Sequence, residues 1–111
     1  MKPGIPILAS GNPVIFKPAP NLTNTARVLQ ETFEMGGFTE AEVSHLFASD
    51  DQCAELIADK RLRGVNFTGS TAAGRKVAAL ASANLKKSSL ELGGSDPFII
   101  CADANIPDTV E

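Results

Sequence analysis

The chain has 111 residues, a net charge of −3 from 10 basic and 13 acidic side chains, and a hydrophobic share of 43%. These values are ordinary for a globular protein, so they exclude a disordered or fibrous class and allow one domain with a modest core. Basic side chains are mixed with acidic ones and Trp and Tyr are absent, which argues against a nucleic-acid partner. No apolar run approaches the roughly 18 residues of a membrane-spanning helix, so no membrane partner is expected.

The two cysteines, Cys53 and Cys101, lack the spacing of metal ligands, so no metal site is predicted. We expect Cys53 to lie in the core on a helix face, and Cys101, which ends an apolar run without a basic neighbour, to be buried. Neither is expected to be a nucleophile. Residues 1–4 are too polar, and too broken by Pro and Gly, to begin a signal peptide. A reducing, cytoplasmic location is therefore expected.

The chain begins with a strand followed by a helix. The short apolar run 14–16 stops at a Lys-Pro pair, which predicts a buried strand. Apolar residues then recur at helical spacing, with Asn21 and Thr23 as capping residues and two glycines at 36–37 as the end signal. This segment is predicted to be an amphipathic helix.

A second strand and a second helix are predicted next. Residues 43–48 are apolar or β-branched without a helical period, and His45 within them is expected to be a packed residue rather than a catalyst. Ser49 followed three residues later by Gln52 is a capping-box signature. A short helix is therefore predicted to start after Ser49 and to end near Asp59.

The second half of the chain continues the alternation. A strand at 64–67 leads through a turn at 68–71 into an alanine-rich helix, and a fourth strand is predicted at 88–92. The apolar run 97–101 predicts a fifth strand, and Asn105 marks a helix start. Alternating strands and helices build a parallel sheet covered by helices. The predicted fold is α/β, an open, mostly parallel, Rossmann-like sheet with helices on both faces.

Polar groups fall at three predicted strand ends, where open α/β sheets bind ligands. Lys17 follows the first strand, Glu91 ends the fourth, and Gly69 with Ser70 opens a helix whose free N–H groups suit an anion. Ser70 is equally well explained as a simple helix cap. The pattern is not a P-loop, because Arg75 follows the second glycine where Lys-Ser/Thr is required, so an NTPase is excluded.

Glu91 is the most specific candidate for chemistry. It ends a strand-like stretch and precedes Gly93 and Gly94, which allow backbone conformations closed to other residues and close approach of a ligand. An acid held in this way can act in catalysis. A solvated acid or an ion-pair partner is the simpler interpretation of Glu91 taken alone.

Three motifs carry a family resemblance: residues 11–18 (GNPVIFKP), 67–74 (FTGSTAAG) and 90–94 (LELGG). In order and spacing they resemble the aldehyde dehydrogenase superfamily over nearly the whole chain. Three further stretches are similar to its succinate-semialdehyde dehydrogenase branch, namely 46–49, 55–59 and 92–99. The resemblance implies that residues 1–111 form a partial NAD(P)-binding domain, incomplete relative to the full family fold.

The resemblance also implies how the adenosine half of the cofactor is bound. Lys17 would contact the adenosine ribose, and Phe67 and Ala73 would line the adenine side. Pro20 stands where NAD-preferring relatives often have a glutamate that binds both ribose hydroxyls. The expected cofactor is therefore NAD or NADP.

The remaining implied roles lie nearer the reaction. Gly69 and Ser70 would contact the pyrophosphate, and the carbonyl of Leu92 would touch the nicotinamide. Glu91 matches the family's general base, which helps activate the cysteine or the water that hydrolyses the thioester. This match favours the catalytic interpretation of Glu91 over the solvated one.

The implied parent activity is NAD(P)-dependent oxidation of succinate semialdehyde or a similar small aldehyde to the acid, in a homo-oligomer. The family's nucleophilic cysteine and an oxyanion-hole asparagine have no match here, so the chain alone is expected to be inactive. The alternative is a non-catalytic nucleotide-binding or self-associating α/β module, whose open strand edges pair with another copy. Within the superfamily, an acyl-phosphate or acyl-CoA reductase is a third possibility.

Overall fold

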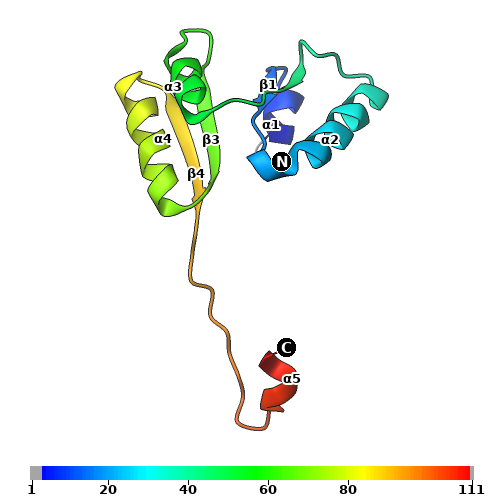
Figure 1. The fold of residues 1–111 in the computed structure, drawn as a ribbon, viewed down its shortest axis with the longest axis vertical. Helices are drawn as coiled ribbons and strands as arrows, with labels where there is room; N and C mark the ends of the chain where they lie inside the picture. The colour runs from blue at the N-terminus through cyan, green and yellow to red at the C-terminus, as the bar shows by residue number, and fades with distance from the viewer. Residues whose placement is uncertain (1–3, 111) are drawn as a thin grey trace.

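The computed structural model describes residues 4–110, whose strands form two separate parallel sheets (Figure 1). In the first sheet, β1 (Val14–Phe16) pairs with β2 (Val43–His45), and in the second, β3 (Gly64–Gly69) pairs with β4 (Lys87–Leu92). The predicted α/β class and parallel pairing are confirmed. The prediction of a single sheet is not confirmed, because no backbone hydrogen bonds join the two pairs of strands within the described residues.

The prediction of no signal peptide falls on residues 1–4, of which 1–3 lie outside the described residues, as does residue 111. From Gly4 the chain forms a short helix, α1 (Gly4–Ala9), which was not predicted from the sequence. Pro6 lies in the first turn of this helix, where the missing N–H has no intrahelical acceptor to lose. Gly4 is buried because the ring of Phe16 covers the place where a Cβ would lie.

The first sheet packs against α2 (Thr23–Met35) to form a small aromatic core. Val43 is fully buried, and Ala26 and Phe33 of α2 are nearly so. The rings of Phe16 and Phe33 stack with centroids 6.0 Å apart, and Phe38 meets Phe33 edge-on at 5.5 Å. Burial of Phe33 and the contacts among these rings add hydrophobic stabilisation to this half of the molecule.

The start of α2 differs from the prediction. Asn21 lies inside a 3-10 turn, η1 (Pro20–Leu22), and the N-cap residue is Leu22, which has no side-chain capping bond. The Thr23 hydroxyl instead donates to the Pro20 carbonyl at 3.2 Å. A turn set by proline, rather than a capping side chain, therefore leads the chain into α2. The predicted glycine end is confirmed, with Gly37 at a φ of +88°.

The segment from β2 to α3 (Asp50–Ala58) confirms the predicted capping box. The Ser49 hydroxyl accepts from the Gln52 N–H at 3.2 Å, and Gln52 Oε1 accepts from the Ser49 N–H at 2.9 Å. The strand before it is shorter than predicted, since β2 ends at His45 and residues 46–49 are irregular. Ladder pairing stops there because β1 ends opposite His45.

The second sheet is covered on one face by α4 (Thr71–Ala83). Gly74 and Ala81 of this helix are buried, and a Cβ on Gly74 would collide with the Leu92 side chain of β4. The absence of a Cβ on Gly74 lets the helix approach the strand while the Leu92 side chain keeps its position. Lys86 lies just before β4 and donates to the carbonyls of Asp59 and Leu62, which ties this strand to the turn before β3.

Beyond β4 the chain continues as an extended arm, residues 93–105, to α5 (Ile106–Val110), which lies apart from both sheets (Figure 1). The predicted fifth strand over 97–101 is wrong, because this segment pairs with no strand of residues 4–110 and exposes 74% of Phe98 and 82% of Ile99. The radius of gyration is 18.0 Å, against about 13 Å for a compact domain of this size.

Candidate functional site

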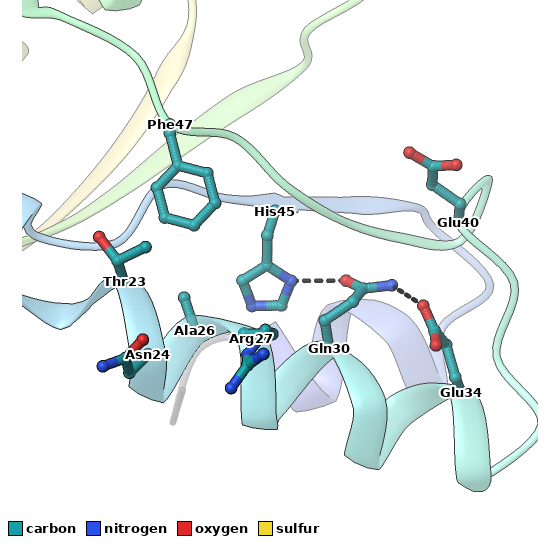
Figure 2. A pocket seen from close by; sticks show the side chains of 9 residues that line it. All are labelled: Thr23, Asn24, Ala26, Arg27, Gln30, Glu34, Glu40, His45 and Phe47. Carbon is teal, nitrogen blue, oxygen red and sulfur yellow. Dashed lines mark hydrogen bonds between the residues drawn. The ribbon is translucent and has the colours of Figure 1, made fainter.

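Two adjoining hollows lie beside α2 and the irregular segment after β2. The larger, which we call the His45 hollow, has a volume of about 420 Å³ and is drawn in Figure 2. The smaller, the Lys17 hollow, has a volume of about 270 Å³ and is lined by Lys17, Pro18, Pro20, Thr23, Phe47 and Ala48. Thr23 and Phe47 line both hollows, so the two spaces share a wall.

A chain of hydrogen bonds crosses the His45 hollow (Figure 2). His45 Nδ1 lies 2.6 Å from Gln30 Oε1, and Gln30 Nε2 donates to Glu34 Oε1 at 2.9 Å. Because the amide oxygen accepts, this network gives Nδ1 the hydrogen and leaves Nε2 as an acceptor. Nε2 is buried with no partner among the described residues.

His45 is a packed residue, as predicted. Its ring stacks on Phe16 with centroids 5.4 Å apart. Burial away from water disfavours the imidazolium and lowers the pKa of His45 below its ordinary value of 6.5. At neutral pH the ring is therefore uncharged and part of the core of the first sheet.

The Lys17 hollow brings together two of the predicted cofactor residues. Lys17 follows β1 directly and is exposed, and Pro20 opens the turn before α2. The Lys17 ammonium makes a single long bond, 3.4 Å to the Pro18 carbonyl, and no ion pair within residues 4–110. It is therefore available to an anion or to hydroxyl groups in the hollow.

The turn between β3 and α4 confirms Ser70 as a helix cap. The Ser70 hydroxyl accepts from the Ala73 N–H at 3.2 Å, which leaves the earlier N–H groups without intrahelical partners. Together with the helix dipole, these groups retain the capacity to hold an anion. The Phe67 ring lies over Gly69, where a Cβ would overlap it, and is half-buried.

Glu91 is exposed on β4, directly opposite Thr68 of β3 in the strand register. Residues alternate between the faces of a strand, and Leu92 contacts α4, so Glu91 and Thr68 share the uncovered face. The Glu91 carboxylate makes no hydrogen bond or ion pair within residues 4–110. It is therefore open to a reacting group brought to this face.

For the glycine pair after Glu91, the expected unusual backbone conformation is wrong, whereas close approach of a ligand stays a prediction. Neither Gly93 nor Gly94 has a positive φ, and a Cβ on either would meet open space. The glycine in this region that cannot be replaced freely is Gly74, because it packs against Leu92. Close packing of a helix on a strand, rather than turn geometry, is the constraint.

The predicted site residues fall into two groups. Lys17 and Pro20 line one hollow, whereas the others lie on the second sheet and its helix: Phe67, Gly69, Ser70, Ala73, Glu91 and Leu92. Neither hollow is lined by a residue of β3, α4 or β4. The structure therefore does not bring the two groups into one hollow. Sequence reasoning also missed Phe47 as a lining residue, because it was placed inside the predicted strand 43–48.

The two cysteines lie away from both hollows. Cys101 is exposed on the arm, contrary to the predicted burial, because the strand expected to bury it does not form. Cys53 is half-buried on α3. Among residues 4–110 no group of three or more His, Cys, Asp or Glu side chains could hold a metal ion. No helix in this part of the chain is long and apolar enough to cross a membrane.

The lysine after β1, the capped turn before α4 and the exposed glutamate on β4 can be compared with known families. The profile of the aldehyde dehydrogenase family matches residues 1–111. This chain belongs to the aldehyde dehydrogenase family. The resemblance noted from the three sequence motifs is therefore confirmed at the level of the family.

Relatives within the aldehyde dehydrogenase family cover the chain almost fully. A succinate semialdehyde dehydrogenase [NAD(P)+] of Escherichia coli is 40% identical over 106 residues, which are 96% of this chain and 23% of that enzyme. A vanillin dehydrogenase of Amycolatopsis is 41% identical over 102 residues, covering 91% of this chain and 21% of that enzyme. The chain thus spans less than a quarter of the length of these relatives.

A solved structure gives the same fold. The crystal structure of succinic semialdehyde dehydrogenase from Streptococcus pyogenes in complex with NADP+ matches with a TM-score of 0.83 and 41% identity. The match covers 92% of this chain and 22% of that enzyme. The described residues therefore have the backbone arrangement of one part of an aldehyde dehydrogenase.

Proposed function

We propose that this chain supplies the cofactor-binding part of an NAD(P)-dependent aldehyde dehydrogenase. The parent reaction is oxidation of succinate semialdehyde or a similar small aldehyde to the acid, in a cytoplasmic homo-oligomer. The observation that carries the proposal is the unpaired Lys17 ammonium in a hollow at the end of β1, in a chain of this family. The names of the relatives support succinate semialdehyde as the substrate.

The residues of the Lys17 hollow fit the adenosine half of the cofactor. The exposed Lys17 ammonium suits ribose hydroxyls, and it suits equally the extra phosphate of NADP. Pro20 brings no carboxylate to the hollow, so nothing there repels that phosphate. We therefore propose that the site accepts both NAD and NADP. When bound, the cofactor supplies the acceptor for the hydride.

The second group of residues would serve the rest of the cofactor and the reaction. The free N–H groups after Ser70 suit the pyrophosphate, and the carbonyl of Leu92, at the end of β4, is proposed to touch the nicotinamide. Glu91 is proposed as the general base, because its carboxylate is exposed and not engaged by another described residue. Neither cysteine lines a hollow, so we propose that the chain alone does not oxidise aldehydes.

The role of Glu91 can be tested in a chimera in which this chain replaces the matching segment of a longer relative. Glu91→Gln keeps the size of the side chain and removes its basicity. We expect kcat to fall by about 10²- to 10⁴-fold, the usual contribution of a general base, with little change in KM for NADP+. Steady-state production of NADPH gives both constants.

The matched control is Glu55→Gln, which neutralises an exposed acid on α3 outside both hollows. This variant should keep the turnover of the unmodified chimera. Undiminished turnover in Glu91→Gln would remove Glu91 from the reaction. Equal losses in both variants would mean that the net charge, rather than the base, matters.

A second candidate function is supported by one observation. The arm exposes Phe98 and Ile99, and the sheets of residues 4–110 have open edges, which favours a module that associates with another copy. Such a module would need neither a nucleophile nor an aldehyde. Its test is the mass of the chain in solution.

A further inference from the structure

Positive charge gathers at one end of the second sheet. In the sequence, no Asp or Glu occurs between residues 60 and 90, and no Lys or Arg follows residue 87. The turn before β3 and the turn before β4 lie side by side, because Lys86 binds the carbonyls of Asp59 and Leu62. We call the cations of these two turns the basic end: Lys60, Arg61, Arg63, Lys86 and Lys87.

Most of the charge of the basic end is not neutralised by the fold. Within residues 4–110 its one ion pair joins Arg61 to Asp59 at 2.7 Å. The side chains of Lys60, Arg63 and Lys87 are exposed and make no ion pair with a described residue. Cations grouped in this way attract an anionic partner and steer its approach.

An apolar side chain stands next to these cations. Leu85 is 96% exposed, and with a φ of +53° it is the one non-glycine residue of the described chain in the left-handed region. It ends α4 in a Schellman motif: its N–H donates to the Ser82 carbonyl at 3.0 Å, and the Lys86 N–H donates to the Ala81 carbonyl at 2.8 Å. Glycine is the usual residue there, because a side chain is strained. The fold alone therefore does not account for Leu85.

The arm has the complementary pattern. Its exposed apolar residues Phe98 and Ile99 lie between two exposed acids, Asp96 and Asp103. The arm leaves the carboxyl end of β4, whereas the basic end lies at the amino ends of β3 and β4 (Figure 1). Within one copy the two surfaces are therefore at opposite ends of the second sheet, and the arm that meets the basic end belongs to another copy.

We propose that the basic end is the docking surface for the arm of a second copy of this chain. The Leu85 side chain is buried against Phe98 and Ile99, and the opposite charges on either side fix the direction of the arm. The inference rests on the second candidate function, the self-associating module, and adds the surface that the arm binds. Because the two surfaces differ, the contact is heterologous and can extend beyond a dimer.

Charge reversal on the two surfaces tests the contact. Lys60→Glu with Lys87→Glu sets acids against the acidic arm, and Asp96→Lys with Asp103→Lys sets cations against the basic end. We expect light scattering to give the monomer mass of 11.6 kDa for each double variant alone. Their equimolar mixture should exceed this mass, because opposite charges then meet again. A mixture that stays monomeric would overturn the proposal.

The matched control is Arg75→Glu with Lys76→Glu, which reverses two exposed cations in the first half of α4, away from the basic end. It should keep the mass of the unmodified chain, and loss of association here would mean that net charge matters instead. A monomeric unmodified chain would overturn both the module and its docking surface. Association that survives every reversal would overturn the docking surface alone.

A substitution of Leu85 separates docking from folding. Leu85→Gly removes the strained side chain, so it should not lower Tm, yet it should weaken self-association because the apolar contact is lost. A fall in Tm with unchanged association would overturn the docking role of Leu85. Binding of phosphatidylserine vesicles that is lost in Lys60→Glu with Lys87→Glu, while the mass in solution is unchanged, would assign the basic end to an anionic membrane surface instead.

Discussion

At the scale of single residues, His45 is the side chain whose surroundings make the stability of the fold depend on pH. Its ring is held between Phe16 and Gln30, and Nε2 has no partner among the described residues. The charged side chains that line the same hollow are Arg27, Glu34 and Glu40. The guanidinium opposes an imidazolium and the two carboxylates favour one, but burial prevails and lowers the pKa of His45.

This environment predicts that stability falls in mild acid. Between the lowered folded-state pKa and the ordinary value of 6.5, the unfolded chain binds more protons than the folded chain does. The stabilising contribution is therefore complete above pH 6.5 and is lost as pH falls through this window. Urea unfolding followed by circular dichroism from pH 7.5 to 5.5 measures the effect.

His45 is the only histidine in the sequence, so a substitution of this residue is a specific control for the pH dependence. His45→Gln cannot titrate in this range, so the free energy of unfolding should become almost independent of pH between 7.5 and 5.5. A slope that is the same in both proteins would show that another group titrates there. The expected slope would then not belong to His45.

At the scale of elements, the contact between α4 and β4 has at least as large an effect on stability at Gly74 as local helix propensity has. An alanine in place of a helical glycine would ordinarily stabilise a helix by about 1 kcal/mol. Gly74, however, lies where a Cβ collides with Leu92. Overpacking of this kind costs about 1–3 kcal/mol, so the two effects have opposite signs and the cost of the collision equals or exceeds the gain in helix propensity.

We therefore predict that Gly74→Ala destabilises the chain by up to about 2 kcal/mol, the overpacking cost less the gain in propensity. Thermal unfolding by circular dichroism gives the comparison with the unmodified chain. The double variant Gly74→Ala with Leu92→Ala removes the colliding side chain and should lose less stability than the sum of the single variants. Strict additivity would mean that Leu92 is not the obstacle.

At the scale of the whole molecule, the main features are the extended arm and the unpaired edges of the two sheets. The chain extends over 56 × 37 × 27 Å, and its arm places apolar side chains in solvent (Figure 1). Apolar, extended segments next to unpaired strand edges are templates for pairing between chains. The same features would also be covered by further chain in an enzyme of the length of the relatives.

Light scattering tests whether the arm mediates self-association. We expect the chain at high concentration to exceed its monomer mass of 11.6 kDa, because pairing buries Phe98 and Ile99. The double variant Phe98→Glu with Ile99→Glu should return to 11.6 kDa. Val28→Glu, an equally apolar exposed position on α2, should not change the mass. A monomeric unmodified chain would remove the self-associating module from consideration.

The sequence by itself determined the features that depend on neighbouring residues. The capping box of Ser49 and Gln52, the cap at Ser70 and all four strands were predicted, because these signals act within a few residues. The family also followed from the sequence, since its motifs are short and ordered. The polar positions of Lys17 and Glu91 at strand ends were predicted in the same way.

Only the tertiary structure decided which of these residues meet. The run 97–101 has the composition of a strand, yet a strand needs a neighbour to receive its hydrogen bonds, and none lies beside it. The hollow around Lys17 is closed by Thr23 and Phe47, which are distant in sequence and are joined only by packing of α2 against β2. Local patterns set the elements, and contacts between distant residues set the site.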